Sequence, residues 1–321
     1  MSTDRIVRLH DDAATDPAEV GVKNSRLAQL SREGIPVPAG FAVTASAYSD
    51  FVREGRLGPV IAHEIRRYRA GRDVRVVAAA IRTAFGATSW PSALADEILA
   101  GYEELGGDGT EVAVRCSPIT PQDEARDELF LHLNTGADVL AACRRCFADL
   151  FSAAAVGKRE LCGPDHLTAA MPVTVQLMVR SDRSGSGTVH GESTFVRIRA
   201  AWGLGEPAAE DPDQYSIHPG TQPMIVRHRG AKRTKTVYAG RRATRPVPTT
   251  PKERSGLVLT DGELQVLAQW SVVADAHFKR RMELDWAKDG ESGRLYLVEA
   301  RPLSFPAIVI ASSPTATALQ H

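Results

Sequence analysis

The sequence has no surplus of charge of either sign and no long apolar run. Lysine plus arginine equals aspartate plus glutamate, at 39 each, so the composition does not indicate nucleic acid or a membrane surface as a partner. The first residues, MSTDRIVRLHDDAATD, contain no apolar core of signal-peptide length, and no stretch approaches the roughly 20 apolar residues that span a bilayer. We therefore expect a cytoplasmic protein.

Cysteine is also scarce, because four cysteines in 321 residues are too few for a disulfide framework. Cys143 and Cys146 form a C-x-x-C, but they lie inside ADVLAACRRCFADLFSAA, which has a helical composition. Cys116 and Cys162 provide no second ligand pair at the spacing of a zinc site. Ordinary helix cysteines are the favoured interpretation, and a metal or redox role for the pair stays open.

The chain is long enough, and at 43% hydrophobic residues apolar enough, to bury a sizeable core. Its first half alternates helices with single strands. The stretch KNSRLAQLSREGIPVPAGFAV predicts a helix closed by Gly34, a proline-stiffened turn and a short strand, and Thr44 can cap the helix that follows. Further helices are expected at about 59–70, 73–85 and 91–105, strands at 111–115 and 173–179, and LFLHLN with the cysteine-bearing helix between those strands.

Beyond the Gly/Ser-rich turn at 181–187 the pattern changes towards strands. FVRIRAAW, QPMIVRH and KTVYAG alternate as half-buried strands do. The helix that begins at Thr260 has Glu263 three residues on, which is a capping box. We expect two lobes that meet near residue 180, with an N-terminal lobe over 1–180, a C-terminal lobe over 181–305 and a loosely ordered tail over 306–321.

The stretch MELDWAKDGESGRLYLVEARP, at 282–302, predicts a hairpin with an electrostatic problem. Period-two alternation places Glu283 and Asp285 on one face of the first strand, and Glu299 and Arg301 on one face of the second. Three carboxylates then share one patch of sheet and repel unless a cation offsets them. That cation could be Mg²⁺ with a nucleotide, or neighbouring lysine and arginine side chains.

Six ordered segments resemble the ATP-binding region of one family: VGVKNSRLAQLSREGIPVPAGFAVTASAY, EVAVRCS, VQLMVRSDRSG, AAWGLGE, LTDGELQVLA and the hairpin. They are similar to the N-terminal region of phosphoenolpyruvate synthases and pyruvate phosphate dikinases, which rifampin phosphotransferases share. The resemblance covers roughly residues 18 to 305. It implies an α+β fold of the ATP-grasp type, in which two lobes hold ATP between them, with ATP and Mg²⁺ as cofactors.

The resemblance assigns roles in the first lobe. Lys23 matches a turn lysine that reaches ATP phosphates, and Arg115 matches a strand-end arginine whose guanidinium suits phosphate oxygens. Gln176 matches a glutamine in the strand that lines the adenine pocket. The alternatives are a solvated lysine at a helix start, a buried arginine paired with an acid, and a surface-strand glutamine.

In the second lobe, Asp285, Glu299 and Arg301 match hairpin positions that look like metal and phosphate contacts, and Glu283 belongs to the same motif. A purely structural ion cluster is the alternative. Glu206, in GLGE, is a further candidate that is equally consistent with a structural role.

Several positions depart from the family pattern. The hairpin has Glu-x-Asp where the family has Asp-x-Glu, and Glu299 stands where it has Gln. The turn lysine follows Gly21-Val22 rather than two glycines, and valine resists positive φ. The segment after Arg115, CSPITPQDEARDELFLHLN, contains no glycine, so the loop that folds over the triphosphate in the family is expected to be missing.

The family's full-length members carry a phosphohistidine on a separate mobile domain, and none of the nine histidines in this chain stands in a similar motif. We therefore expect an ATP-binding, Mg²⁺-dependent phosphotransferase that passes phosphate to a histidine carrier on a partner chain. Two alternatives remain. One is a small-molecule kinase or ligase that acts without a carrier, and the other is a non-catalytic nucleotide-binding subunit.

The segment from Arg227 to Arg254 carries ten lysines or arginines and one acid, Glu253. It is interpreted as a solvated face, as a docking site for an acidic partner, or as a contact to bound phosphates. Nucleic acid is least favoured, because only Tyr238 interleaves the charges.

Overall fold

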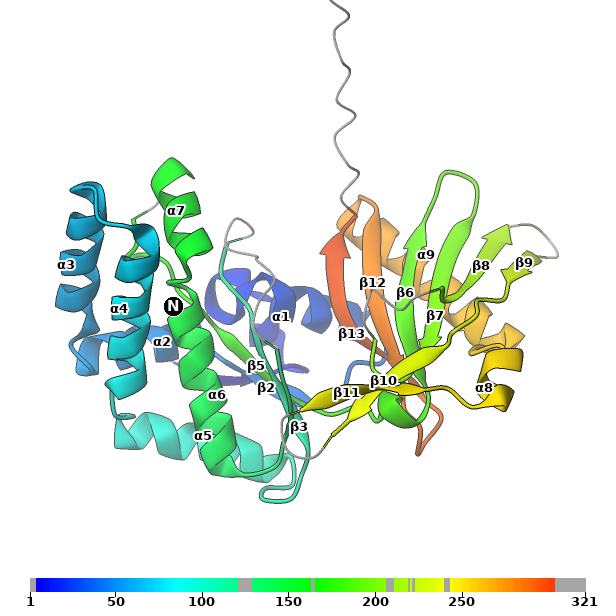
Figure 1. The fold of residues 1–321 in the computed structure, drawn as a ribbon, viewed down its shortest axis with the longest axis horizontal. Helices are drawn as coiled ribbons and strands as arrows, with labels where there is room; N and C mark the ends of the chain where they lie inside the picture. The colour runs from blue at the N-terminus through cyan, green and yellow to red at the C-terminus, as the bar shows by residue number, and fades with distance from the viewer. Residues whose placement is uncertain are drawn as a thin grey trace, which may run out of the picture.

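The computed structural model describes residues 4–120, 129–162, 165–205, 211–218, 220, 223–239 and 243–303. They form two lobes that lie side by side, each built around one antiparallel sheet with helices (Figure 1). The α+β class expected from the sequence is therefore confirmed.

The first sheet has five strands in the order β1-β2-β5-β3-β4. Their bounds are β1 Ile6–Arg8, β2 Gly40–Val43, β3 Val112–Cys116, β4 Leu129–Leu133 and β5 Val173–Leu177. Helices cover one face, and they are α2 Ala45–Glu54, α3 Leu57–Arg69, α4 Val74–Ala87, α5 Ser92–Glu104, α6 Gly136–Asp149 and α7 Ala153–Cys162. Alternate strand residues such as Val114 and Val175 pack with aromatic side chains of these helices in one buried cluster.

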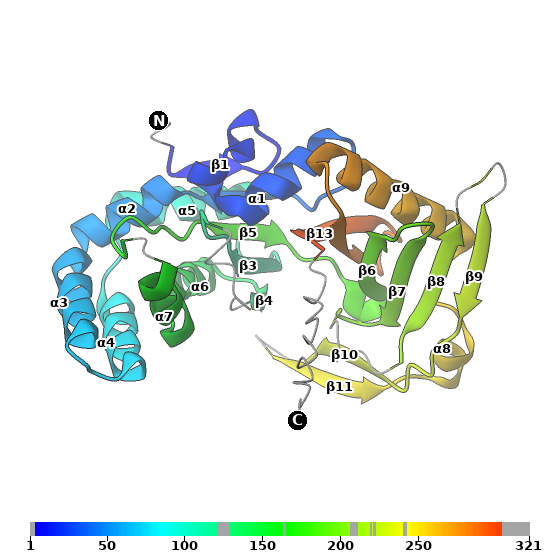
Figure 2. The same ribbon diagram turned by 90° about the horizontal axis from the view of Figure 1, so that it is seen from above.

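Helix α1 (Pro17–Arg32) lies on the other face of this sheet and continues to the second lobe (Figure 2). It follows the short 3₁₀ turn η1 (Asp12–Thr15) and is capped by the Asp16 side chain, which accepts a hydrogen bond from the Ala18 amide. Leu27 and Leu30, on its second half, belong to the hydrophobic core of the second sheet. One helix is thus shared by both cores.

The second sheet has six strands in the order β13-β12-β6-β7-β8-β9. Their bounds are β6 Gly185–Gly191, β7 Val196–Trp202, β8 Asp213–His218, β9 Met224–His228, β12 Met282–Lys288 and β13 Leu295–Pro302. Helix α9 (Asp261–Phe278) covers one face, and Leu264 and Leu267 pack there against Val189, Ile198 and Leu284. The opposite face carries no such apolar cluster among the described residues.

A two-stranded ribbon, β10 (Thr234–Tyr238) and β11 (Thr244–Pro248), lies on the side of this sheet that is opposite α9 (Figure 2). It leads into the short helix α8 (Pro251–Ser255). Lys232, just before the ribbon, is buried and paired with Asp213 of β8, and Lys235 pairs with Glu253. These ion pairs neutralise part of the basic segment internally.

Most expected elements are present, with three differences. The cysteine-bearing helix breaks after Asp149 into α6 and α7, and the turn expected at 181–187 is only the 3₁₀ turn η3 (Ser181–Arg183) followed by β6. Strands β1, β8 and β11 and helix α8 were not expected. The predicted tail at 306–321 lies outside the described residues.

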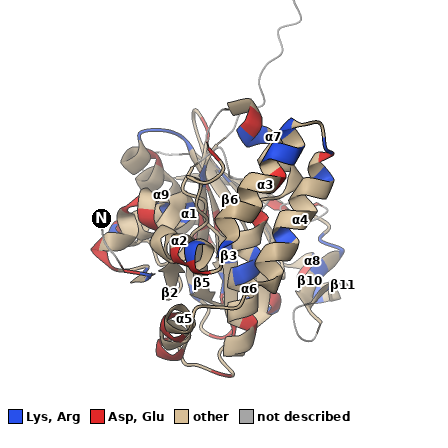
Figure 3. Ribbon diagram, turned by 90° about the vertical axis from the view of Figure 1, so that its left-hand side faces the viewer, with Lys and Arg blue, Asp and Glu red and all other residues tan. Residues whose placement is uncertain are grey.

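Cys116, Cys143 and Cys146 are buried in the first core and Cys162 is exposed, and none of the four forms a disulfide with another described residue. Burial raises the pKa of the Cys143 thiol, as expected of structural helix cysteines. Within the described ranges, no helix combines the length and apolar character needed to cross a bilayer. Over the helical face of the first lobe, acidic and basic residues are interspersed rather than gathered into a patch of one sign (Figure 3).

Candidate nucleotide site

Arg115 and Gln176 lie on the same face of the first sheet, the face opposite its helical core. The register pairs Ala113 with Gln176 and Arg115 with Thr174, while the alternating residues Val114 and Val175 point into the core. Alternation therefore directs both predicted side chains towards α1 and the second lobe. The Thr174 hydroxyl donates to Asn24 Oδ1 of α1, which fastens the helix to this face.

Lys23 follows a kink in α1 that Gly21 makes possible. Gly21 has φ 80° and ψ 160°, and a Cβ atom there would lie 1.6 Å from the Ser117 carbonyl oxygen. Val22 is not among the described residues with positive φ, and its amide donates to the Pro118 carbonyl over 2.9 Å. The turn therefore does not require at Val22 the positive φ that valine resists.

The β12–β13 hairpin brings its charged residues to one face, as the sequence predicted. Glu283 is opposite Arg301 and Asp285 is opposite Glu299 in the register. Arg301 Nη1 donates to Asp285 Oδ2 over 2.7 Å, and its Nη2 donates to Glu283 Oε1. Part of the positive charge that the hairpin requires is therefore supplied by its own arginine.

The first lobe supplies two more cations to the same place. Lys23 Nζ is 3.6 Å from Glu299 Oε1, and Arg115 Nη1 donates to the Val298 carbonyl over 2.9 Å. Residues from α1, β3 and β13, which are far apart along the chain, thus meet at one point between the sheets. The three hairpin acids face Lys23, Arg115 and Arg301.

The two central acids differ in their proton affinity. Burial raises the pKa of Asp285 to about 6, although Arg301 opposes the shift. Burial acts in the same direction on Glu299, but Lys23, Arg115 and Arg301 together hold its pKa below its usual value. Asp285 is therefore poised to change its charge when another cation approaches.

Asp285 Oδ1 and Arg115 Nε are buried at this point and have no hydrogen-bond partner among the described residues. An unpaired buried acceptor and an unpaired buried donor are costly, so such atoms usually have a further partner. Asp285 Oδ1 and the facing Glu299 fit a divalent cation whose remaining ligands are phosphate oxygens and water. Arg115 Nε fits an anion.

Among the described residues, no three His, Cys, Asp or Glu side chains are grouped so as to hold a metal ion by themselves. Glu283 is the least free of the predicted ligands, because Arg301 binds one oxygen and His190 Nδ1 lies 3.6 Å from the other. Any cation here depends on ligands from outside the protein, as Mg²⁺ commonly does with nucleotide phosphates.

Gln176 is buried, and its side-chain amide donates to the Pro38 carbonyl over 3.0 Å. It lies one residue before the strand ends, where the chain passes towards the second lobe. Glu206 lies outside the described residues.

Sequence reasoning missed residues beside the site. His190 is opposite Glu283 on β6, just after the stretch 181–187 that we interpreted as a turn. Arg26, which is buried in α1, donates to the Ala300 carbonyl over 3.4 Å. The period-two pattern of VRIR in β7 was a usable signal for the charged side chains at 197 and 199, since it places both arginines on one face.

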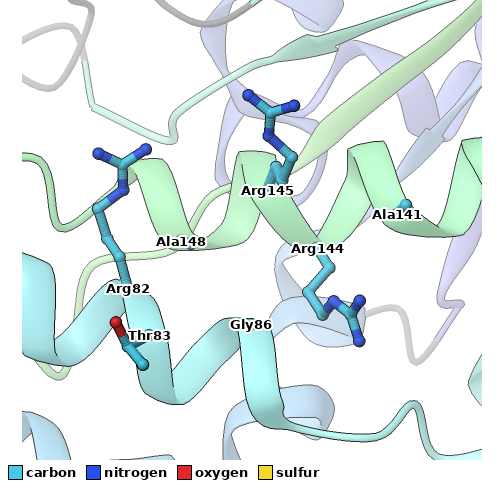
Figure 4. A pocket seen from close by; sticks show the side chains of 7 residues that line it. All are labelled: Arg82, Thr83, Gly86, Ala141, Arg144, Arg145 and Ala148. Carbon is cyan, nitrogen blue, oxygen red and sulfur yellow. The ribbon is translucent and has the colours of Figure 1, made fainter.

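A separate cavity of about 350 Å³ lies between α4 and α6, on the far side of the first core from these residues. Figure 4 shows Arg82 and Arg145 pointing to one side of it and Arg144 to the other. Arg144 donates to the Thr88 carbonyl over 3.1 Å, and Arg145 lies 4.4 Å from the Phe130 ring centroid. The three guanidinium groups do not converge on a common ligand position.

The two-lobed arrangement is that of a nucleotide-binding domain, and comparison with known proteins agrees. The family model described as "Pyruvate phosphate dikinase, AMP/ATP-binding domain" matches residues 17–309. The chain belongs to this family, and the ATP-grasp assignment follows from that membership.

The curated relatives are phosphoenolpyruvate synthases. The one from Synechocystis sp. is 33% identical over 333 residues, covering 89% of this chain and 40% of the relative. The one from Escherichia coli K12 is 35% identical over 322 residues, covering 89% of this chain and 40% of the relative. The chain thus spans about two fifths of the length of the relatives it matches.

Among solved structures, a D-alanine–D-alanine ligase from Bacillus anthracis is 8% identical with a TM-score of 0.28, covering 66% of this chain and 56% of that chain. This likeness is too weak to support an inference.

Proposed function

We propose that this domain binds ATP with Mg²⁺ between its lobes and takes part in phosphoryl transfer. The observation that carries the proposal is the meeting of Lys23, Arg115 and the hairpin acids from separate elements, with Asp285 Oδ1 and Arg115 Nε left unpaired. Positioning and charge stabilisation are what phosphoryl transfer requires of a protein.

In this proposal Lys23, Arg115 and Arg301 bind phosphate oxygens. Asp285 and Glu299 hold the metal, and Glu283 orients Arg301 or joins the metal ligands. When bound, Mg²⁺ supplies positive charge to the phosphate oxygens. Gln176 lies near the adenine, and Glu206 is retained as a nucleotide contact. The division into lobes at residue 180, with a C-terminal lobe to 305, is part of the same proposal.

The relatives are named phosphoenolpyruvate synthases, and this chain matches only their ATP-binding part. We propose that the phosphoryl group passes to a histidine carrier outside residues 1–321, with AMP and phosphate as the other products. Four cysteines without a disulfide among the described residues agree with a reducing compartment such as the cytoplasm, where we place the protein.

One observation favours a second candidate, a non-catalytic nucleotide-binding subunit. Arg301 already neutralises Glu283 and Asp285 through direct ion pairs, so the hairpin is electrostatically satisfied in part without a metal. Product analysis separates the alternatives. AMP plus phosphate indicates the dikinase route, ADP indicates a direct kinase or ligase, and the absence of turnover despite binding indicates the non-catalytic subunit.

Titration calorimetry with ATP, with and without Mg²⁺, tests the nucleotide site. We expect binding that Mg²⁺ strengthens, and at least a tenfold loss of affinity in Lys23→Ala and in Arg115→Ala, since each removes a charged contact worth about 1.5–3 kcal/mol. Arg8→Ala is the matched control, because Arg8 pairs with Glu104 on an exposed surface. Equal affinities in all three variants, or no binding by the wild-type protein, would contradict the proposal.

A further inference from the structure

The polar face of the second sheet continues beyond the hairpin. The register aligns one residue from each strand across the sheet, on the face opposite α9. From β13 to β9 this row is Glu299, Asp285, Thr188, Arg199, Gln214 and His228. Neighbouring strands are about 4.8 Å apart, so the Cα atom of Arg199 lies roughly 10 Å from that of Asp285.

Arg199 differs from the other arginines of the sheet face. In the part of the chain that the structure describes, its guanidinium has neither an ion pair nor a hydrogen bond. Its neighbours in the row, Thr188 and Gln214, are neutral and half-buried and can hydrogen-bond to a ligand. A half-buried guanidinium without an anion is what a site for an external anion presents.

Arg197 provides the contrast. It lies two residues earlier on the same strand and the same face, but its Nε donates to Glu192 over 3.1 Å and its guanidinium lies 5.2 Å from the Phe195 ring centroid. Among the described residues, Arg197 therefore has an internal anion and an aromatic contact, whereas Arg199, on the same face of the same strand, has no internal anion.

We infer that Arg199, with Thr188 and Gln214 beside it, forms a phosphate-binding subsite on the second lobe, distinct from the cations that meet at the hairpin. The inference rests on the proposed function, because it places the subsite on the same sheet face as the metal ligands. The phosphate has two possible sources, the polyphosphate of ATP or a separate inorganic phosphate.

The test compares Arg199→Gln with Arg197→Gln by titration calorimetry, using ATP, AMP and inorganic phosphate as three separate probes. If the polyphosphate occupies the subsite, Arg199→Gln binds ATP at least tenfold more weakly while its affinity for AMP is unchanged. If inorganic phosphate occupies it, the loss appears with that probe. Arg197→Gln should match the wild type with every probe, and Arg199→Lys should recover part of the affinity.

Several outcomes overturn the inference. They are equal affinities of Arg199→Gln and wild type for ATP and for phosphate, a loss that is the same for AMP as for ATP, and an equal loss in Arg197→Gln. Thermal unfolding of each variant confirms that it is folded. Failure of the wild type to bind any of the three probes would contradict the proposed function as well, whereas tight ATP binding that is indifferent to Arg199 removes only the inference.

Discussion

Tyr238 of β10 stacks on His132 of β4, with ring centroids 4.8 Å apart and ring planes inclined by 17°. The two residues come from different lobes, and Arg180, at the passage between the lobes, lies 5.8 Å from the Tyr238 ring centroid. The Glu111 carboxylate contacts both neighbours of the Tyr238 ring, since Oε1 lies 2.9 Å from His132 Nε2 and Oε2 lies 3.3 Å from Arg180 Nη1. The ribbon is thereby fastened to the first lobe beside the proposed nucleotide site.

Loss of this stack should weaken the contact between the two lobes. Tyr238→Ala is expected to lower the free energy of unfolding by about 1–3 kcal/mol, because it removes the ring contact and part of its burial. It should also speed hydrogen exchange in β4 and β10. Tyr238→Phe is the control, since among the described residues the hydroxyl contacts only Met178 Sδ, at 3.8 Å. Matching exchange rates in both variants would refute the role of the stack.

Gly21 should be far less tolerant of a side chain than Gly34, although both have a φ near +80°. A Cβ atom at 21 meets the Ser117 backbone, whereas none of the surrounding atoms lies within 4 Å of one at 34. Gly34→Ala is expected to cost about 1 kcal/mol from its left-handed φ, and Gly21→Ala on the order of 3 kcal/mol or more. Chemical denaturation measures both. Equal costs would show that the α1 kink relaxes freely.

The buried pair of Lys232 and Asp213 anchors the start of the ribbon, and both side chains are almost fully enclosed. Lys232→Met leaves the Asp213 charge buried without its partner and should cost about 3–5 kcal/mol. Lys235→Met, which breaks a more exposed pair with Glu253, should cost about 1 kcal/mol or less. Urea denaturation of the two variants gives the comparison, and a Lys232→Met protein as stable as the Lys235→Met protein would exclude an anchoring role.

The raised pKa of Asp285 makes a pH-dependent contribution to stability. The folded protein holds this proton up to about pH 6, whereas the unfolded chain releases it near 3.9. The unfolded state therefore binds fewer protons between these values, and stability falls as the pH rises through this window. The asparagine of Asp285→Asn cannot ionise, so this variant does not lose stability in the window. Its free energy of unfolding should therefore rise relative to that of the wild type by on the order of 1–3 kcal/mol from pH 4 to pH 7.

Asp289→Asn is the control for this measurement. Hydrogen bonds from the Ser292 backbone and side chain outweigh burial and lower the pKa of Asp289, so its stabilising contribution is lost only as the pH falls below about 4. The difference between this variant and the wild type should stay flat from pH 4 to pH 7. If the difference in the free energy of unfolding between Asp285→Asn and the wild type is also constant over this pH range, the Asp285 carboxyl of the wild type titrates normally.

Local signals in the sequence predicted the helices well. The Thr44 hydroxyl accepts from the Ala47 amide over 3.2 Å, and Thr260 and Glu263 form the expected capping box. Such bonds join residues three apart, so the sequence contains everything that they need. The shared face of the hairpin acids was predictable for the same reason, because alternation along a strand is local.

Pairing between distant strands was less predictable. The run GSGTVHG has the composition of a turn, yet it forms β6 between β12 and β7. Gly187 allows the close approach, since a Cβ atom there would lie 1.9 Å from the Arg199 carbonyl oxygen. Pro246 lies in β11, which is tolerated in a two-stranded ribbon. The pairing of Arg301 with Glu283 and Asp285 likewise depends on cross-strand geometry that the sequence alone left open.

The position of α1 has a consequence for dissecting the protein. Leu27 and Leu30 belong to the hydrophobic core of the second sheet. A fragment that begins at residue 181 lacks α1 and would expose the apolar surface that this helix covers. Such a fragment should be insoluble when it is produced alone. Its solubility should be restored when residues 1–180 are produced with it as a separate chain. The two halves of this chain are therefore better separated by point substitutions than by truncation.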